Sequence, residues 1–335
     1  MTAEQGESST FAPMPVSSPS VIAGLLRFFV SYVSFLGMAS SLVIFLSLAH
    51  VRVTLPVAWA IVFFSAVLGF LYGVNMTTHP PAGVAIRASA RQRGSMCLLG
   101  VIVLLYVFLW IVAWLKPDHS FDGNWYHIPA IHEWVRTGWV HWIGGIPSPD
   151  EWYAGTLGYI NGYPKGAELF SFLLVQCTGS SAPVNAPNLV FLPLGLAAVA
   201  LLAQILGASS RASIVAALLY LLVPVNLTQA PTTYIDSSHA ACVVAVLALL
   251  AINRLAWRAG ETPWRVVPVL GAGAGLVMSI KTTGFVVAPL MLVALAIQMG
   301  WNLQAFRRLP RRLLFLFLVG SIALCVGGYW VLRNM

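Results

Sequence analysis

Long apolar segments recur along the chain and alternate with short polar ones. A helix needs about 20 mostly apolar residues to cross the hydrocarbon core of a bilayer. The pattern therefore predicts an all-α fold, a polytopic transmembrane bundle of about nine spans. The predicted spans are residues 21–49, 57–75, 96–115, 188–206, 212–228, 236–255, 266–280, 284–300 and 313–331.

One long segment, 116–187, interrupts this pattern and is predicted to be an external loop. It contains five tryptophans, which suit a membrane–water interface, so we expect juxtamembrane helices in it. Residues 166–178 are short and only moderately apolar, and are predicted to belong to these helices. The other expected parts are a disordered cytoplasmic tail (1–20), three N-terminal transmembrane helices (21–115) and a six-helix transmembrane part (188–335).

Composition excludes a soluble protein. Hydrophobic residues make up 59% of the 335 residues and charged ones 8%, against about 25% charged in soluble domains. The net charge of +8 does not indicate nucleic acid, because the basic residues lie in short loops between apolar segments. None of the four cysteines forms a C-x-x-C pair, and three lie in apolar segments, as expected for buried packing.

The basic residues predict the orientation of the chain. Cytoplasmic loops of membrane proteins carry an excess of Lys and Arg. With nine spans and a cytoplasmic N-terminus, twelve of the 18 basic residues fall inside, including the cluster Arg307 to Arg312. This assignment places the loop 116–187, the turn 229–236 and the residues 281–283 on one outer face.

The stretch FDGNWYHIPAIHEW, residues 121–134, concentrates ionisable chemistry in a chain that has little of it. A helix is predicted to follow Gly123 and to end at Gly138. Two interpretations of Asp122 stay open. It caps this helix, or it is a carboxylate among apolar rings, where a raised pKa suits a general base.

The two histidines of this stretch do not predict a metal site. His127 and His132 are five residues apart, whereas ligands on one helical face need a spacing of three or four. For His127, hydrogen bonding near a substrate and interfacial packing both stay open. Further along, Glu168 follows Pro164 in the first turn of a predicted helix, where the helix dipole favours a carboxylate, and Lys165 is placed to pair with it or with lipid headgroups.

Two more ionisable residues lie at the ends of predicted spans. Asp236 begins a membrane helix, where it caps the helix or has a functional role, with His239 one turn later. Lys281 interrupts an apolar run, where it snorkels to the interface or binds an anion such as phosphate together with the threonines that follow. The preceding glycines, Gly271, Gly273 and Gly275, predict close helix packing.

Four of these stretches, in this order, resemble motifs of the membrane glycosyltransferases of the GT-C fold, which include protein O-mannosyltransferases and lipid A aminoarabinose transferases. They are FDGNWYHIP, YPKGAELF, QAPTTYID and GAGAGLVMSIKTTG, and the closing GGYWVLRN is also similar. The resemblance covers roughly residues 116–335. It departs from the family in having three spans before the first motif loop, and it implies that the chain corresponds to an N-terminal portion of such an enzyme.

The resemblance implies transfer of a sugar from a polyprenyl-phosphate-linked donor to an extracytoplasmic acceptor, which is a glycan, lipid or protein, at a bacterial plasma membrane. It makes Asp122 the catalytic residue and implies no cofactor, and although some members of this family use a divalent metal, none is indicated here. The implied substrate-binding residues are Tyr126, His127, Glu168, Tyr234, Asp236 and Lys281.

Other classes of membrane protein are alternatives. Transporters also carry ionisable residues near helix breaks, but they often show inverted repeats, and no repeat is evident here. A polytopic acyltransferase would need a histidine deep in the membrane. A non-catalytic membrane subunit stays open.

Overall fold

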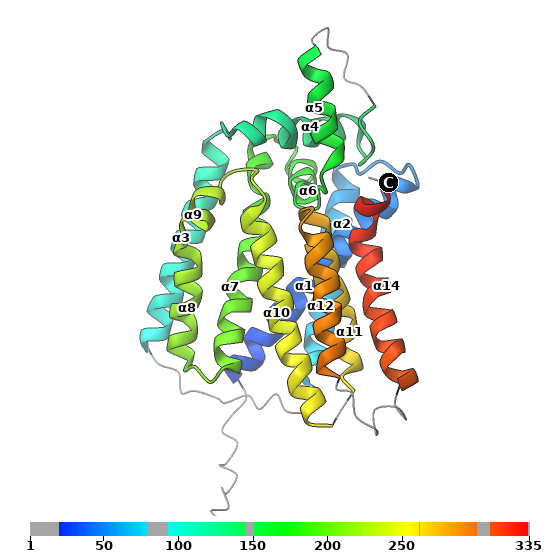
Figure 1. Ribbon diagram of the computed structural model, residues 1–335. Helices are drawn as coiled ribbons and strands as arrows, with labels where there is room; N and C mark the ends of the chain where they lie inside the picture. Colours follow the sequence, from blue (N-terminus) through cyan, green and yellow to red (C-terminus); the bar gives the residue numbers. More distant parts are fainter. Residues whose placement is uncertain (1–19, 79–92, 145–150, 261, 300–308, 334–335) are drawn as a thin grey trace, which may run out of the picture.

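The computed structural model describes residues 20–78, 93–144, 151–260, 262–299 and 309–333. Every regular element in these ranges is helical, and no strand occurs among them. Most of the helices run side by side in a bundle (Figure 1). The predicted all-α class is therefore confirmed for the described part of the chain.

Within the part of the chain that the structure describes, six helices are long and apolar enough to cross a membrane. By length and composition, these helices support the predicted polytopic membrane protein, and the number of nine spans stays a prediction. They are α1 (Ser20–Leu48), α2 (Leu55–Thr78), α3 (Arg93–Leu115), α7 (Pro187–Ile205), α10 (Asp236–Arg258) and α14 (Leu309–Arg333).

The other three expected spans form shorter helices. The expected single span 212–228 is wrong, because the helix breaks at Val223 between α8 (Ser210–Leu222) and α9 (Pro224–Gln229). Pro224 explains the break, since a proline disfavours helical backbone at the residue before it, and Val223 has φ −56° and ψ 127°. The last two are α11 (Val267–Ile280), preceded by the 3₁₀ turn η3 (Trp264–Val266), and α12 (Gly284–Gln298).

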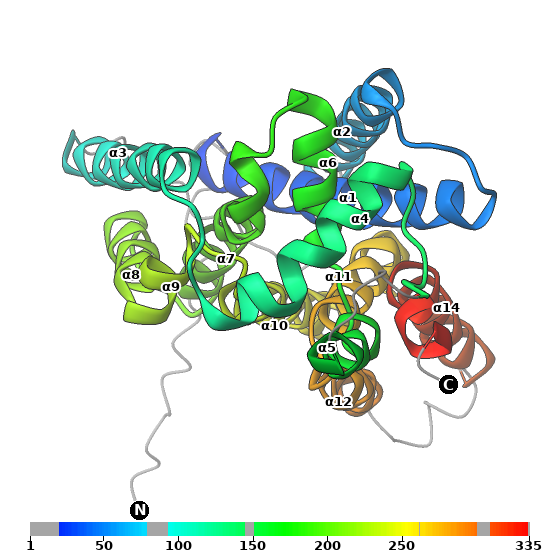
Figure 2. The ribbon, with the colours of Figure 1, turned by 90° about the horizontal axis from the view of Figure 1, so that it is seen from above.

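The segment between α3 and α7 covers one end of the bundle. It contains η1 (Gly123–His127), α4 (Ile128–Thr137), α5 (Glu151–Gly162), α6 (Glu168–Thr178) and η2 (Ala182–Asn185). Helices α4 and α6 lie across the bundle end, whereas α5 projects away from it (Figures 1 and 2). As predicted, α4 ends at Gly138, whose φ of 84° is favourable only for glycine and whose amide bonds the Trp134 carbonyl.

The same end of the bundle collects the other polar segments. The C-terminal end of α3, the start of α10, the junction between α11 and α12 and the C-terminal end of α14 all lie there (Figure 1). The expectation that the loop 116–187, the turn 229–236 and residues 281–283 share one face agrees with this arrangement. We call this region the polar end.

Glycines allow the closest helix contacts, as the sequence predicts for α11. A side chain on Gly271 would meet Ile322 of α14 at 2.6 Å, and one on Gly275 would meet the Val326 Cβ at 2.6 Å and the Ala323 carbonyl at 2.7 Å. Small residues of this kind let helix backbones approach closely where lipid provides no hydrophobic driving force. Helix α11 is consequently buried along most of its length.

We expect Gly275→Ala to destabilise the protein, because the added methyl group overlaps two atoms of α14. Overpacking of this kind costs about 1–3 kcal/mol. The measurement is the midpoint of thermal unfolding in detergent. Gly320→Ala is the matched control, since a side chain at Gly320, on α14 itself, meets nothing within 4 Å. Equal midpoints for the two variants would contradict tight α11–α14 packing.

Candidate functional site

Asp122 lies just before the π-helical turn η1 at the polar end. Its Oδ2 accepts a hydrogen bond of 3.0 Å from the Tyr126 hydroxyl. It does not cap a helix: its own backbone is helical, with φ −62° and ψ −38°, and its side chain makes no capping hydrogen bond. Of the two interpretations left open by the sequence, capping therefore fails, and the carboxylate is available for chemistry beside a phenol.

The ring of Tyr126 contacts His127 and Lys165. Its ring centroid lies 4.2 Å from that of His127 and 4.9 Å from the Lys165 ammonium. Burial raises the pKa of the Tyr126 hydroxyl well above its usual value, and the negative charges of Asp122 and Glu168 raise it further. Tyr126 therefore keeps its proton and acts as a donor to Asp122.

His127, Glu168 and Lys165 form a buried polar triad beneath this pair. His127 Nδ1 donates to Glu168 Oε1 at 2.5 Å, and Lys165 Nζ donates to the same oxygen at 3.3 Å. All three side chains are at most 1% exposed. The sequence left two partners open for Lys165, Glu168 or lipid headgroups, and the structure shows the pair with Glu168. Because of this burial, neither His127 nor Glu168 presents its side chain to solvent.

Glu168 stays ionised despite this burial. Burial by itself raises the pKa of its carboxyl, but the Lys165 charge and the His127 hydrogen bond outweigh that effect and hold the pKa below its usual value. A buried charge needs such partners, because an unpaired one is costly. The triad is thus a closed ionic unit, in which His127 Nε2 and Glu168 Oε2 are the buried atoms without a protein partner.

A second polar centre lies at the start of α10. Lys281 Nζ donates to Asp236 Oδ1, and Gln229 Nε2 donates to Asp236 Oδ2 at 3.0 Å. Asp236 makes no capping hydrogen bond, and Lys281 has extended backbone between α11 and α12. Both side chains are partly exposed, at 44% and 38%. Neither capping by Asp236 nor simple snorkelling by Lys281 describes this pair.

Tyr234 contributes a backbone hydrogen bond next to this centre. Its carbonyl accepts a hydrogen bond from the Asn188 amide, whose oxygen in turn accepts from Ser238 at 2.6 Å. The Tyr234 side chain is partly buried, and its role as a substrate contact stays a prediction.

Asp118 links the segment before η1 to the turn before α10, and the sequence analysis did not select it. Its Oδ2 accepts from both the amide and the hydroxyl of Thr233, each at 2.7 Å, and its Oδ1 accepts from the Ser120 amide at 2.8 Å. Burial by itself raises the pKa of Asp118, but the bonds from Thr233 and Ser120 outweigh it and lower that pKa. Gly123 packs against Thr233 so closely that no side chain fits at that position.

The predicted meeting of Asp122, Asp236 and Lys281 is therefore supported in part. The structure brings Asp236 and Lys281 into contact and links the Asp122 turn to the same region through Gly123 and Thr233. That all three line one outward-opening cavity stays a prediction.

The remaining ionisable residues of 121–134 separate from this site. His132 is exposed, and Glu133 forms an ion pair of 2.6 Å with Arg136 on the outer side of α4. Among the described residues, no group of three or more His, Cys, Asp and Glu side chains is placed to hold a metal ion.

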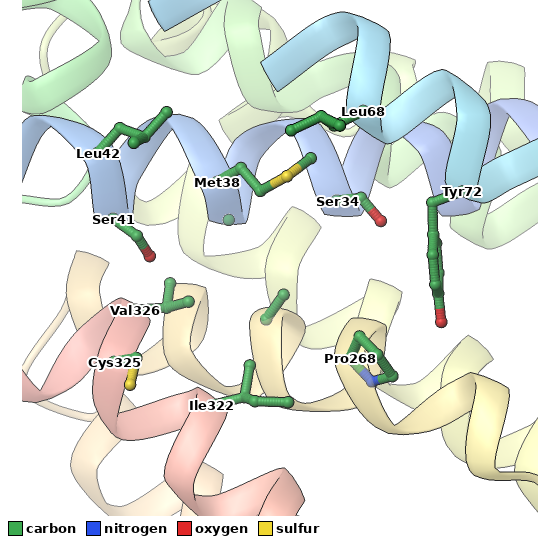
Figure 3. A pocket seen from close by; sticks show the side chains of 12 residues that line it. Ser34, Met38, Ser41, Leu42, Leu68, Tyr72, Pro268, Ile322, Cys325 and Val326 are labelled. Carbon is green, nitrogen blue, oxygen red and sulfur yellow. The ribbon is translucent and has the colours of Figure 1, made fainter. Parts of the chain in front are cut away.

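An apolar groove lies between α1 and α2 on one side and α11 and α14 on the other. Met38 and Leu68 face Ile322 and Val326 across it (Figure 3). No charged residue lines this groove, so the acid–base groups belong to the polar end.

Comparisons with known proteins give no relative. No protein-family model, curated protein or solved structure matches the chain.

We expect Asp118→Ala to destabilise the protein by about 2 kcal/mol or more, because it leaves the buried Thr233 donors unpaired and hydrogen bonds to charged groups are worth about 1.5–3 kcal/mol. Unfolding in detergent measures this. Glu133→Ala is the control, since its partner Arg136 is 72% exposed and a surface ion pair of this kind contributes about 0–1 kcal/mol. An Asp118→Ala variant as stable as the control would show that the bond to Thr233 does not hold the two segments together.

Proposed function

We propose that the chain is an integral membrane glycosyltransferase that uses a polyprenyl-phosphate-linked sugar and acts on an extracytoplasmic acceptor. The observation that carries the proposal is the convergence of the four motif stretches at the polar end. They supply an Asp122–Tyr126 pair on one segment and an Asp236–Lys281 pair at a helix break on two others. The resemblance of these stretches to GT-C motifs gives the reaction class.

The proposed topology has nine crossings, with α8, α11 and α12 as the three shorter ones and the N-terminus in the cytoplasm of a bacterial cell. The support is that these helices run alongside the long ones (Figure 1). In addition, Arg258 ends α10, and Arg311 and Arg312 lie in the first turn of α14, at the end of the bundle opposite to the motifs. The polar end then faces outward, where a lipid-linked sugar and its acceptor would meet.

In this proposal, Asp122 is the general base. It accepts the proton of the acceptor hydroxyl as the acceptor oxygen attacks the anomeric carbon. The bond between that carbon and the phosphate oxygen breaks, the lipid phosphate leaves with the electron pair, and the configuration inverts. The Tyr126 hydroxyl occupies Oδ2, which leaves Oδ1 of Asp122 for the acceptor.

Lys281 is the proposed contact for the departing phosphate. A cation placed where negative charge develops stabilises the transition state. Asp236 holds one of the three N–H donors of the ammonium and Gln229 holds Asp236, so Lys281 is oriented and still has donors to offer. Tyr234 is retained as a proposed contact to the donor beside this pair. No step of this scheme requires a metal or cofactor.

A transporter is less well supported by the same observations. Substrate sites of secondary transporters lie near the middle of the bilayer, at broken helices. Here the ionisable pairs gather at one end of the bundle instead.

We expect cysteine labelling to place the polar end outside. In a cysteine-free background, Thr178→Cys on α6 should react with a membrane-impermeant maleimide on intact cells. Ala259→Cys, after α10, should react only once the membrane is permeabilised. Both positions are exposed in the structure. The reverse pattern would put the site in the cytoplasm and contradict the proposed reaction.

We expect Asp122→Asn to abolish sugar transfer while the protein stays folded. Loss of a general base typically lowers the rate about 100- to 10,000-fold. The measurement is transfer of a radiolabelled sugar from lipid-extracted donor in membranes containing the full-length protein. Glu133→Gln is the matched control, because this carboxylate of the same segment is paired with the exposed Arg136 and has no role in the proposed reaction.

Wild-type transfer by Asp122→Asn would remove Asp122 from the mechanism. The absence of any transfer by the wild-type protein, across membranes supplied with extracted lipids of several bacteria, would count against the glycosyltransferase proposal as a whole.

A further inference from the structure

The buried triad of Lys165, Glu168 and His127 lies directly against the ring of Tyr126. We infer that the triad is a positioning device that fixes the Tyr126 hydroxyl on Asp122, rather than a substrate-binding group. The inference rests on the proposed function, because it assigns a task to Asp122. It gives His127 and Glu168 a role different from the one that the motif resemblance implies.

One carboxylate oxygen determines where both neighbours of the Tyr126 ring lie. Glu168 Oε1 accepts from His127 Nδ1 at 2.5 Å and from Lys165 Nζ at 3.3 Å. His127 places its ring centroid 4.2 Å from that of Tyr126, and Lys165 places its ammonium 4.9 Å from it. A cation near an aromatic ring face attracts the ring, most strongly where water is excluded. A shift of Glu168 therefore moves both contacts of Tyr126 together.

The triad is in turn attached to the end of the buried helix α11. The Gly166 amide, between Lys165 and Glu168 in sequence, donates to the Ser279 carbonyl at the end of α11 at 2.6 Å. Ser279 also fills the space beside Gly166, so no side chain fits there. Lys281 follows two residues after Ser279. The segment that holds Tyr126 is therefore tied to the helix whose end carries the proposed phosphate contact.

Burial argues for positioning over direct binding. All three side chains are at most 1% exposed, so none of them presents its polar atoms to solvent. Functional groups depend on supporting side chains whose rotamers are locked by packing and hydrogen bonds. The triad side chains are restrained both by packing and by hydrogen bonds. Asp122, by contrast, is partly exposed and therefore accessible to a substrate.

A fluorine probe at Tyr126 tests the inference without relying on activity. 3-Fluorotyrosine is introduced at position 126 of the whole chain, and its ¹⁹F resonance is recorded in detergent. We expect one narrow resonance for the otherwise wild-type protein. Glu168→Gln should shift or broaden it, because the variant weakens both ring contacts. Glu133→Gln, on the outer side of α4, should leave it unchanged.

Kinetics of the full-length enzyme give the second measurement. We expect Glu168→Gln to lower kcat at least tenfold while KM for the lipid-linked donor stays within about twofold, since Lys281 is untouched. A purely structural role would instead lower the unfolding midpoint and the amount of folded protein, with kcat per folded molecule unchanged. If Glu168→Gln does not fold, Lys165→Arg carries the same test, because it keeps the charge and changes its position over the ring.

An unchanged ¹⁹F resonance in a folded triad variant would overturn the inference. So would normal kcat in a variant whose resonance has moved. A moved resonance in a protein whose wild type transfers no sugar would instead leave the positioning geometry intact and count against the proposed function.

Discussion

The polar end of the molecule depends on the hydrogen bond from the Gly166 amide to the Ser279 carbonyl. It fixes the segment 165–168, from a loop that lies across the bundle, on the end of the buried helix α11. Only glycine fits there, since Ser279 occupies the space a side chain would need. Glu168 is thereby buried with its two donors, and α4 is held above it through His127. Asp118 makes the second attachment, to Thr233 before α10.

The lipid environment explains why the ionisable groups are distributed in this way. Charged groups within a membrane are costly and need partners. At the polar end they divide into two kinds. The side chains of the Lys165–Glu168–His127 triad are buried and bond to one another, so their polar groups stabilise the fold. The Asp122–Tyr126 and Asp236–Lys281 pairs are partly exposed and keep unused hydrogen-bonding capacity. Chemistry is expected from the second kind, supported by the first.

Local features of the fold were predictable, and tertiary pairings were not. The apolar lengths predicted the six long helices, Gly138 predicted the end of α4, and the glycines of α11 predicted its close packing. Pro224 indicates the break between α8 and α9, but the prediction of one continuous span over 212–228 did not take it into account. Asp118 and Thr233 are 115 residues apart, and His127 and Glu168 are 41 apart. No spacing rule connects such residues, because the backbone path between them is set by packing of whole helices.

The most direct test of a single site at the polar end is an electron cryomicroscopy map of the protein in lipid nanodiscs. The ligand is a polyprenyl-phosphate sugar in which carbon replaces the bridging oxygen, so that it cannot transfer. The account predicts phosphate density within hydrogen-bonding distance of Lys281 Nζ and the anomeric carbon on the side that faces Asp122. Phosphate density elsewhere, or a sugar remote from Asp122 with the phosphate on Lys281, would contradict it.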